Sequence, residues 1–292
     1  FFISGTYKIN NKEEKILISL KKGEKKIIKR NNKLYKKFSD HIGVIPLVII
    51  SPDDRNLIIE GSETRRKFID GIICQTNKEY LNTLIDYNKT LKQRNALLKM
   101  FYNDSENIKK TIDIYDNHLS SNAQKIYERR TEFLSDFIPI FKIRYKQLSD
   151  DKENVEIIHK TDISESQSLY KLLKNNLEKD LRFQFTTKGI HKDDLTFSIN
   201  SFSVKKYGSQ GQQKTFLIAL KLAQFDYLSK LNSNPILLLD DIFDKLDDNR
   251  VKQIINLVNE EKFNQIFISD TNKIRSENII KKVNKSYKIF EI

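Results

Sequence analysis

The chain has few of the residues that cross-link or interrupt a fold. Its 292 residues include one cysteine, Cys74, no tryptophan, four prolines and eight glycines. A single cysteine excludes an internal disulfide framework and is typical of a reducing compartment. The longest apolar run, residues 44–50, has seven residues and contains a proline, whereas a membrane-spanning helix needs roughly 20 apolar residues. We therefore expect a cytoplasmic protein without a membrane segment.

Two kinds of site are also missing from the sequence. The four histidines do not have the spacing of metal ligands with the cysteine or with one another. No stretch matches G-x-x-x-x-G-K-[ST], the loop whose backbone N–H groups and lysine hold nucleotide phosphates. The chain opens with FFISGTYKI, a strand-like pattern without an initiating methionine. We interpret it as a fragment of a longer protein, the alternative being a degenerate protein that is not catalytic.

Positive charge is in excess. The chain has 52 lysines and arginines against 39 acidic residues, a formal charge of +13, which favours a phosphate-rich partner. Residues 1–37 contain 12 basic residues and three glutamates, a net charge of +9. Each phosphate that a basic side chain neutralises releases counterions and strengthens binding to DNA. The candidate DNA contacts in this segment are Lys21, Lys22, Lys25, Lys26, Lys29 and Arg30. The alternative is that these lysines only protect exposed strand edges.

The order of strand-like and helical patterns is typical of an α/β protein with a helical insertion. An antiparallel β-meander is predicted, with strands at 1–9, 15–20, 25–30 and 33–35. Parallel core strands are predicted at 47–50, 236–239 and 265–269. Helical spacing extends from residue 62 to about residue 180, and Pro139 predicts a kink or break in its longest helix. We expect an α/β head at 1–61 and 181–292 and an all-helical arm domain at 62–180.

Residues 235–250 read PILLLDDIFDKLDDNR and place two carboxylates at the end of an apolar strand. The four apolar residues 236–239 suit a parallel strand buried on both faces, and Asp240 and Asp241 follow it. In open α/β sheets, chemistry takes place beyond the carboxyl ends of the strands. Acids at that position hold Mg²⁺ and orient a water molecule in nucleoside triphosphatases. The alternative is that both aspartates merely begin a turn.

A second motif, YGSQGQQKT at residues 207–215, marks the start of a helix. Ser209 and Gln212 have the spacing of a capping box, in which the side chain of each residue accepts a hydrogen bond from the backbone N–H of the other. One helix face is expected to be apolar, with Phe216, Leu220 and Ala223. The free N–H groups at such a helix start favour an anion, although capping alone would also explain the pattern.

Taken in order, these motifs resemble those of ABC-type ATPases. SQGQ at Ser209–Gln212 resembles the signature motif, LLLDD resembles Walker B, and KLD at Lys245–Asp247 resembles the D-loop. Within that class the chain is most similar to the RecF family of bacterial DNA replication and repair proteins. The supporting stretches are SPDDRNLIIEGSETRRKFID at 51–70, YNKTLKQRNALLK at 87–99 and GIHKDDLTF at 189–197.

The resemblance implies an ABC-type ATPase head that uses ATP and Mg²⁺. Asp240 would hold Mg²⁺ through water, and Asp241 would position or deprotonate the attacking water. A homodimer is implied, in which the signature helix contacts the ATP of the other subunit. The residues that would bind nucleotide are Ser209, Gln210, Gly211, Gln212 and Asp247. Asp241 stands where many ABC proteins have the longer glutamate, so slow, switch-like hydrolysis is expected. The family's phosphate loop lies upstream of the meander, so the fragment alone is expected to be inactive.

The resemblance also implies partners and further sites. The family binds duplex DNA and its junctions with single-stranded gaps, and with RecO and RecR helps to load RecA in replication, recombination, repair and the SOS response. Asp53 and Asp54 are candidate nucleotide sensors, with an ordinary turn as the alternative. Arg65–Lys67 are candidates for DNA contact, with a solvated helix face as the favoured interpretation. The alternative functions are a non-catalytic DNA-binding clamp and a chromosome-organising head of the SMC or Rad50 kind.

Overall fold

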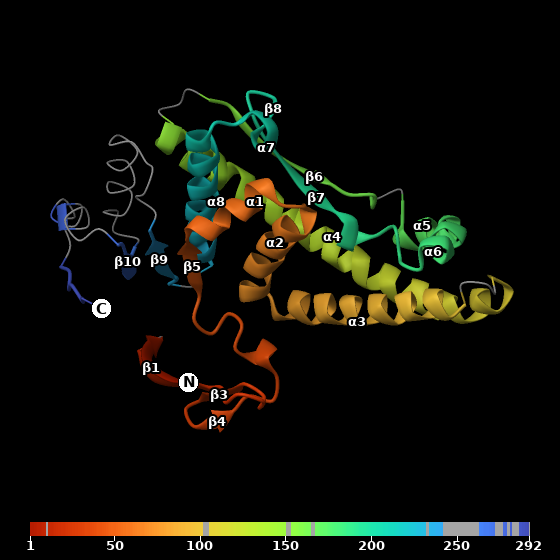
Figure 1. Cartoon of the computed structure of the whole chain (residues 1–292), viewed down its shortest axis with the longest axis horizontal. Helices are drawn as coiled ribbons and strands as arrows, with labels where there is room; N and C mark the ends of the chain where they lie inside the picture. Colours follow the sequence, from red (N-terminus) through yellow and green to blue (C-terminus); the bar gives the residue numbers. More distant parts are fainter. Residues whose placement is uncertain are drawn as a thin grey trace. The chain divides into compact units, whose positions relative to one another are not determined.

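The computed structural model forms two compact units, Phe1–Ile45 and Pro46–Ile292 (Figure 1). The structure describes residues 1–9, 11–101, 105–149, 153–164, 167–231, 234–241, 263–271, 277–278, 281 and 286–291. The predicted division into a head and a helical arm at residues 61/62 and 180/181 stays a prediction.

The first unit is the predicted β-meander. Its four antiparallel strands pair in the order β1 (Phe2–Ile9), β2 (Lys12–Ser19), β3 (Ile27–Arg30) and β4 (Lys33–Leu34). The turn between β3 and β4 consists of Asn31 and Asn32, both with positive φ (48° and 66°), as a two-residue hairpin turn requires. Ile16 and Ile28 are buried, whereas the lysines of this unit are half-buried or exposed.

The second unit contains the predicted parallel sheet. Its strands are β5 (Leu47–Ile50), β9 (Ile236–Asp240) and β10 (Ile266–Ser269), and β9 lies between the other two. In this register Ile50 pairs with Leu239, and Asp240 pairs with Ser269. Leu237 and Leu239 are buried, while Ile236 and Leu238 on the opposite face are half-buried. Burial on both faces of β9 is therefore confirmed only in part.

A separate antiparallel sheet follows the long helix of the chain. It contains β6 (Val155–Lys160), β7 (Asp194–Ile199) and β8 (Phe202–Ser203), in that order. The turn between β7 and β8 contains Asn200 and Ser201, both with positive φ. The short helix α7 (Val204–Tyr207) then leads directly into α8 (Gln210–Lys230).

Helices make up most of the second unit. After the 3₁₀ turn η2 (Pro52–Arg55) they are α1 (Asn56–Ile59), α2 (Ser62–Thr76), α3 (Lys78–Met100), α4 (Ser105–Ser149), α5 (Leu169–Asn175) and α6 (Leu177–Phe183). Helix α4 packs along α3 and also contacts α8 (Figure 1). Its 45 residues correspond to about 68 Å at 1.5 Å per residue.

Helix α4 continues through Pro139, so the helix does not break there, and the other predicted outcome, a kink, stays a prediction. A proline inside a helix costs about 3 kcal/mol, because it removes one backbone hydrogen bond and crowds the preceding turn. Aromatic packing on both sides offsets that cost. Phe137 stacks on Phe133 before the proline, and Phe141 packs on Phe216 of α8 after it. The surrounding core holds the helix together where its own hydrogen bonding is weakest.

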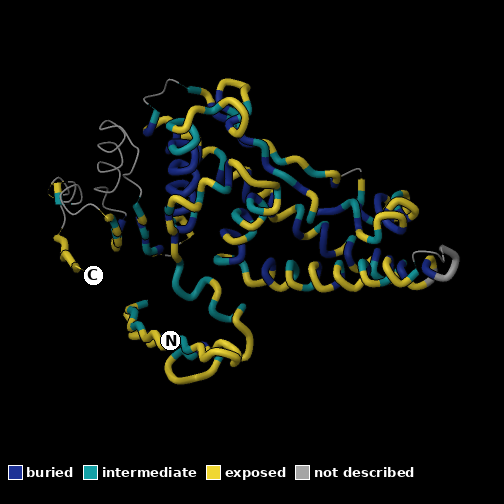
Figure 2. Tube along the Cα trace, viewed as in Figure 1, coloured by how far each residue is buried: buried dark blue, intermediate teal, exposed yellow. Residues whose placement is uncertain are grey.

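Helix α8 is the centre of the core rather than an amphipathic helix on its surface. All of residues 215–225 are buried, including Lys221 and Gln224 (Figure 2). The prediction of a single apolar face is therefore too narrow, because residues on the other faces of α8 are buried as well. The reason is that α8 contacts α4, α2, α1 and strand β5, so that more than one of its sides is covered.

Candidate nucleotide-binding site

The carboxyl ends of the three parallel strands lie at one edge of their sheet. Asp240 is exposed at the end of β9, and its Oδ1 accepts a hydrogen bond of 2.5 Å from the Ser269 hydroxyl. The backbone N–H of Asp241 donates to the Ser269 carbonyl at 3.0 Å. Asp241 has a φ of 46°, so the chain turns sharply immediately after the strand. The structure therefore brings Asp240, Asp241 and Ser269 together at one edge of the sheet. The sequence placed the two aspartates at the end of the strand but did not select Ser269.

The acids after β5 are engaged within the fold. Asp54 accepts a hydrogen bond from the Ser51 backbone N–H at 2.8 Å and thereby caps the 3₁₀ turn η2. Its other carboxylate oxygen lies 2.6 Å from the ammonium of buried Lys221 on α8. These contacts favour the interpretation of this stretch as a turn and helix start. Asp53 is exposed at the same edge.

The capping box at the start of α8 is confirmed. The Gln212 backbone N–H donates to the Ser209 hydroxyl at 3.2 Å, and the Ser209 backbone N–H donates to the Gln212 side-chain oxygen at 2.8 Å. Ser209 and Gln210 are exposed, while Gly211 and Gln212 are half-buried. The N-terminus of a helix of 21 residues attracts anions, because its first N–H groups lack helical partners.

The residue before the cap has to be glycine. A β-carbon at Gly208 would lie 2.6 Å from the carbonyl oxygen of Val204, which belongs to the backbone of α7. The Gln213 side chain also donates to the Gly208 carbonyl at 3.0 Å. The turn from α7 into α8 is thus fixed on both sides of Ser209.

The structure adds Glu153 to this region, a residue that sequence reasoning did not select. Glu153 precedes β6, and its carboxylate accepts a hydrogen bond of 2.6 Å from the side-chain amide of Gln212. The Tyr145 hydroxyl of α4 donates to the other oxygen of the same carboxylate. The two residues Glu153 and Gln212 are 59 positions apart in the sequence, so no local pattern could have paired them.

The GIHKDDLTF stretch is an anchor for buried arginines. Arg130 of α4 is 1% exposed and lies 2.9 Å from both Asp70 of α2 and Asp193. Arg65 forms a two-point ion pair with Asp194, at 2.7 and 3.0 Å. The two adjacent aspartates of this motif therefore hold α4 and α2 against the start of β7.

The interpretation of Arg65–Lys67 as a solvated helix face is wrong for two of the three residues. Arg65 is buried in its ion pair, and Arg66 donates to the Asp193 carbonyl at 2.5 Å. Only Lys67 is exposed, with its ammonium 2.7 Å from Glu63. The aspartates that the two arginines contact lie more than 120 residues away in the chain, where helical spacing carries no information about them.

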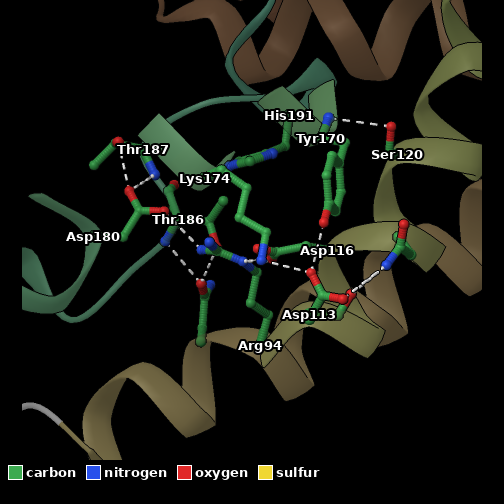
Figure 3. A network of polar contacts seen from close by, with 12 residues as sticks. Arg94, Asp113, Asp116, Ser120, Tyr170, Lys174, Asp180, Thr186, Thr187 and His191 are labelled. Atoms are coloured by element: carbon green, nitrogen blue, oxygen red, sulfur yellow. Dashed lines mark hydrogen bonds and ion pairs between the residues drawn. The ribbon is translucent and has the colours of Figure 1, made fainter. Parts of the chain in front are cut away.

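A second buried network surrounds Arg94 of α3 (Figure 3). Its guanidinium donates to Asp116 at 2.6 Å and to Asp180 at 2.7 Å, and all three side chains are fully buried. Burial raises the pKa of the Asp116 carboxyl. The network joins α3, α4 and α6 and connects through Thr186 to His191.

His191 is half-buried, and both of its ring nitrogens lie within hydrogen-bond distance of neighbouring groups. Its Nδ1 lies 2.8 Å from the Tyr87 hydroxyl, and its Nε2 lies 3.1 Å from the Thr186 carbonyl oxygen. Burial lowers the pKa of the His191 imidazole to about 4, so the ring is neutral near pH 7. With the proton on Nε2, the ring donates to Thr186 and accepts from Tyr87. Gly189 is required beside it, because its φ is 131° and a β-carbon would lie 2.7 Å from the Tyr87 hydroxyl.

The predicted DNA contacts differ in how they are engaged. Arg30 forms a two-point ion pair with Glu14, at 2.9 and 2.7 Å, and this hydrogen bonding lowers the pKa of Glu14 to about 2. Lys21 lies 2.8 Å from Glu24 on the surface. The remaining candidates are Lys22, Lys25 and Lys26 on the exposed loop between β2 and β3 and half-buried Lys29 on β3. Their contact with DNA stays a prediction.

Three further expectations can be compared only with the residues that the structure describes. Asp247 of the predicted D-loop, like the whole range 242–262, lies outside the described residues. Within the described ranges, no helix is both long and apolar enough to cross a bilayer. No set of three His, Cys, Asp or Glu side chains among those residues is arranged to hold a metal ion.

No protein-family model matches the chain, but named proteins and solved structures are similar to it. The DNA replication and repair protein RecF of Flavobacterium johnsoniae is 52% identical over 293 residues, covering 100% of this chain and 81% of that protein. A solved structure of the recombination mediator protein RecF-ATPrS in the RecFOR pathway has a TM-score of 0.82 at 30% identity, covering 93% of this chain and 75% of its own. A second, of RecF-ATP in the same pathway, has a TM-score of 0.81 at 30% identity, with 93% and 76% covered.

A more distant likeness concerns the fold alone. An Smc head bound to the C-winged helix domain of ScpA has a TM-score of 0.51 at 12% identity, covering 95% of this chain and 68% of its own. Together with the two nearer structures, it confirms the predicted α/β fold of an ABC-type ATPase head that carries a helical lobe.

Proposed function

Because this chain belongs to the RecF family of DNA replication and repair proteins, we propose that it acts in recombinational repair and replication as a DNA-binding ATPase that dimerises on ATP. The observation that carries this proposal concerns the segment from the start of α8 to the end of β9, which has a feature of an ATPase site at each end. One is an exposed, capped helix start at Ser209, and the other is an exposed carboxylate at Asp240. The first suits a phosphate group and the second a hydrated cation.

The acidic strand end fits the metal side of an ATPase site. Asp240 is an oxygen ligand of the kind that Mg²⁺ prefers, and Ser269 already fixes the direction of one of its oxygens. We assign Asp240 to hold Mg²⁺ through water. A bound Mg²⁺ ion would neutralise phosphate charge at this edge. Asp241 begins the turn beyond the strand, and we assign it to position or deprotonate the attacking water. The short reach of an aspartate favours slow hydrolysis, as in a switch.

The start of α8 fits the other side of the site. In our proposal Ser209, Gln210, Gly211 and Gln212 contact the γ-phosphate of ATP held by a second copy of the protein, and Asp247 contributes from the D-loop. The solved relatives are structures of RecF-ATP and RecF-ATPrS, which supports a nucleotide at this fold. A contact made across two subunits would join dimerisation to the presence of the third phosphate. Hydrolysis would then release the dimer.

The proposed partners follow from the family and from charge. The relatives are described as a DNA replication and repair protein and as a recombination mediator of the RecFOR pathway. We propose that the ATP-bound dimer sits on duplex or gapped DNA and helps RecO and RecR to load RecA. The net charge of +9 in residues 1–37 supports a phosphate-contacting surface in the meander unit.

The decisive experiment changes the signature serine in the native protein. Ser209→Arg removes the cap, which costs about 1 kcal/mol, and places a long side chain where the partner's phosphate would lie. We expect ATP to bind each subunit as before and ATP-dependent dimerisation to be abolished in sedimentation velocity. Ser135→Arg, at an exposed serine of α4, is the matched control and should dimerise normally. A normal ATP-dependent dimer of Ser209→Arg would refute the proposal.

A further inference from the structure

The side chain of Gln212 is held at both ends of its amide. Its oxygen accepts from the Ser209 backbone at 2.8 Å, and its nitrogen donates to the Glu153 carboxylate at 2.6 Å. An amide can rotate by half a turn and exchange oxygen for nitrogen, which would place a donor against the Ser209 N–H. The charge-assisted bond to Glu153 opposes this exchange, because a carboxylate accepts hydrogen bonds and does not donate them.

Contacts other than the one with Gln212 also fix the position of Glu153. The Tyr145 hydroxyl donates to its second oxygen, and the next residue, Asn154, is tied to Asn200 by two hydrogen bonds. The Asn154 N–H donates to the Asn200 side chain at 2.9 Å, and the Asn200 N–H donates to the Asn154 carbonyl at 2.7 Å. The carboxylate is therefore presented to α8 from a rigid position between the end of α4 and the β6–β7 pair.

An ion pair joins α4 and α8 farther along α8. Arg144, next to Tyr145, is 2% exposed and forms a two-point pair with Asp226 of α8, at 2.5 and 3.1 Å. Gln212 and Asp226 are about 21 Å apart along the axis of α8. The last turns of α4 thus contact Asp226 near the end of α8 directly through Arg144, and reach the start of α8 through the Tyr145 hydroxyl and Glu153.

From these contacts we propose that Glu153 is a positioning residue. It holds the Gln212 side chain, and thereby the cap at Ser209, in the geometry needed to contact the γ-phosphate of ATP bound to a second copy of the protein. This inference rests on the proposed function of the α8 start. It connects the end of α4 to that site through Tyr145 and Glu153. Glu153 does not touch the nucleotide in this scheme and acts through Gln212.

The charge of Glu153 and its hydrogen bond to Gln212 have opposite effects on phosphate binding at the start of α8. A carboxylate beside a helix N-terminus is itself attracted by the helix dipole, and it repels an incoming phosphate at the same place. Glutamine at position 153 keeps an acceptor of the same length and removes the repulsion. Alanine removes both the acceptor and the charge. The two substitutions therefore separate the role of the hydrogen bond from the role of the charge.

The test compares Glu153→Ala and Glu153→Gln in the native protein by three measurements. These are the Kd of ATP-dependent dimerisation, the affinity of the subunit for ATP and the Tm without nucleotide. We expect Glu153→Ala to weaken dimerisation about tenfold, which corresponds to 1.4 kcal/mol. The ATP affinity of the subunit should stay the same. Glu153→Gln should dimerise within about threefold of the parent or more tightly, and Tyr145→Phe should weaken dimerisation in the same direction as Glu153→Ala.

Two controls keep the outcomes distinct. Glu156→Ala removes a half-buried carboxylate from β6, three residues along the chain, and should dimerise normally. Ser209→Arg is measured alongside, and its normal dimerisation would refute the proposed function itself. If Ser209→Arg fails to dimerise while Glu153→Ala dimerises like the parent, the positioning role of Glu153 is wrong. A Glu153→Gln dimer as weak as that of Glu153→Ala would also overturn it, because the acceptor would then not matter.

Discussion

Ser269 and Asp240 are joined twice, as paired residues of neighbouring parallel strands and through their side chains. The Ser269 hydroxyl donates to Oδ1 of Asp240 at 2.5 Å, while the backbone of the next residue, Asp241, donates to the Ser269 carbonyl. The position of the Asp240 carboxylate is therefore set by β10 before any cation arrives. Such supporting hydrogen bonds orient the groups that hold metal ions in many proteins.

The first prediction tests that support. Ser269→Ala removes the hydroxyl without exposing the core, because Ser269 is itself exposed. We expect the ATP hydrolysis rate of the native protein to fall about tenfold and its half-maximal Mg²⁺ concentration to rise. Steady-state hydrolysis over a Mg²⁺ titration measures both quantities. Ser135→Ala on the surface of α4 serves as control, and an unchanged Mg²⁺ dependence of Ser269→Ala would contradict the prediction.

The second prediction concerns the lysines of the β2–β3 loop. Changing Lys21, Lys22, Lys25 and Lys26 to Glu should weaken DNA binding regardless of sequence. It should also reduce the slope of log affinity against log salt by roughly one for each phosphate that the protein no longer neutralises. The control makes the same change of charge at four exposed lysines of the helices, namely Lys89, Lys92, Lys99 and Lys142. Equal slopes in the two variants would mean that only net charge matters.

The third prediction concerns the buried centre of the helices. Arg130→Met leaves the carboxylates of Asp70 and Asp193 without their shared cation, and the Asp193 side chain is 2% exposed. Breaking a buried ion pair on one side costs about 3–5 kcal/mol, and urea unfolding should show a decrease of that size. Arg129→Met is the matched control, since its partner Glu132 lies on the surface and such pairs contribute less than about 1 kcal/mol. Similar decreases in both variants would show that the network does not stabilise the fold.

The fourth prediction concerns pH. His191 has an ordinary pKa of 6.5 when unfolded, which burial lowers to about 4 in the fold. Between these values the unfolded chain binds a proton that the folded chain does not, so the free energy of unfolding must fall as pH falls from 6.5 towards 4. The slope from this one group is at most about 1.4 kcal/mol per pH unit. Urea unfolding at several pH values should show a shallower slope for His191→Gln, and identical slopes would contradict the assignment.

The fifth prediction compares two glycines. Gly208→Ala places a β-carbon 2.6 Å from the Val204 carbonyl oxygen, so the backbone between α7 and α8 must move. We expect the free energy of unfolding to fall by about 1–3 kcal/mol and ATP-dependent dimerisation to weaken, because Ser209 moves with it. A β-carbon at Gly71, inside α2, meets no atom within 4 Å. Gly71→Ala should therefore be neutral or stabilise the protein by up to about 1 kcal/mol, and equal thermal shifts in the two variants would contradict this reasoning.

The parts of the site that the sequence predicted are those whose determinants are local. A run of apolar residues ending in Asp240 and Asp241 gives a parallel strand with acids at its carboxyl end. A serine three residues before a glutamine gives the capping box at Ser209, and the structure contains both features. The meander strands were also predicted, with boundaries shifted by up to three residues at Lys12 and Ile27.

The parts that were missed depend on partners far away in the chain. Arg130 and Asp193 are 63 residues apart, and Arg65 and Asp194 are 129 apart. Helical spacing does not distinguish a buried arginine from a solvated one. It shows which residues form the apolar face, but it does not show which acid contacts an arginine on the polar face. The same holds for Pro139, whose cost is offset by packing that only the folded core supplies.

The separation of β5 from β9 has a consequence for synthesis on the ribosome. The two strands are neighbours in the parallel sheet, yet 185 residues lie between Ile50 and Ile236. At 5–20 residues per second, translation of that interval takes about 10–40 s. Helices α2, α3 and α4 can form during that time, but β5, whose Val48 and Ile50 are 0% and 2% exposed in the final fold, does not yet have β9 to pair with. The edge of β5 that pairs with β9 in the final fold therefore stays without that partner for many seconds during synthesis.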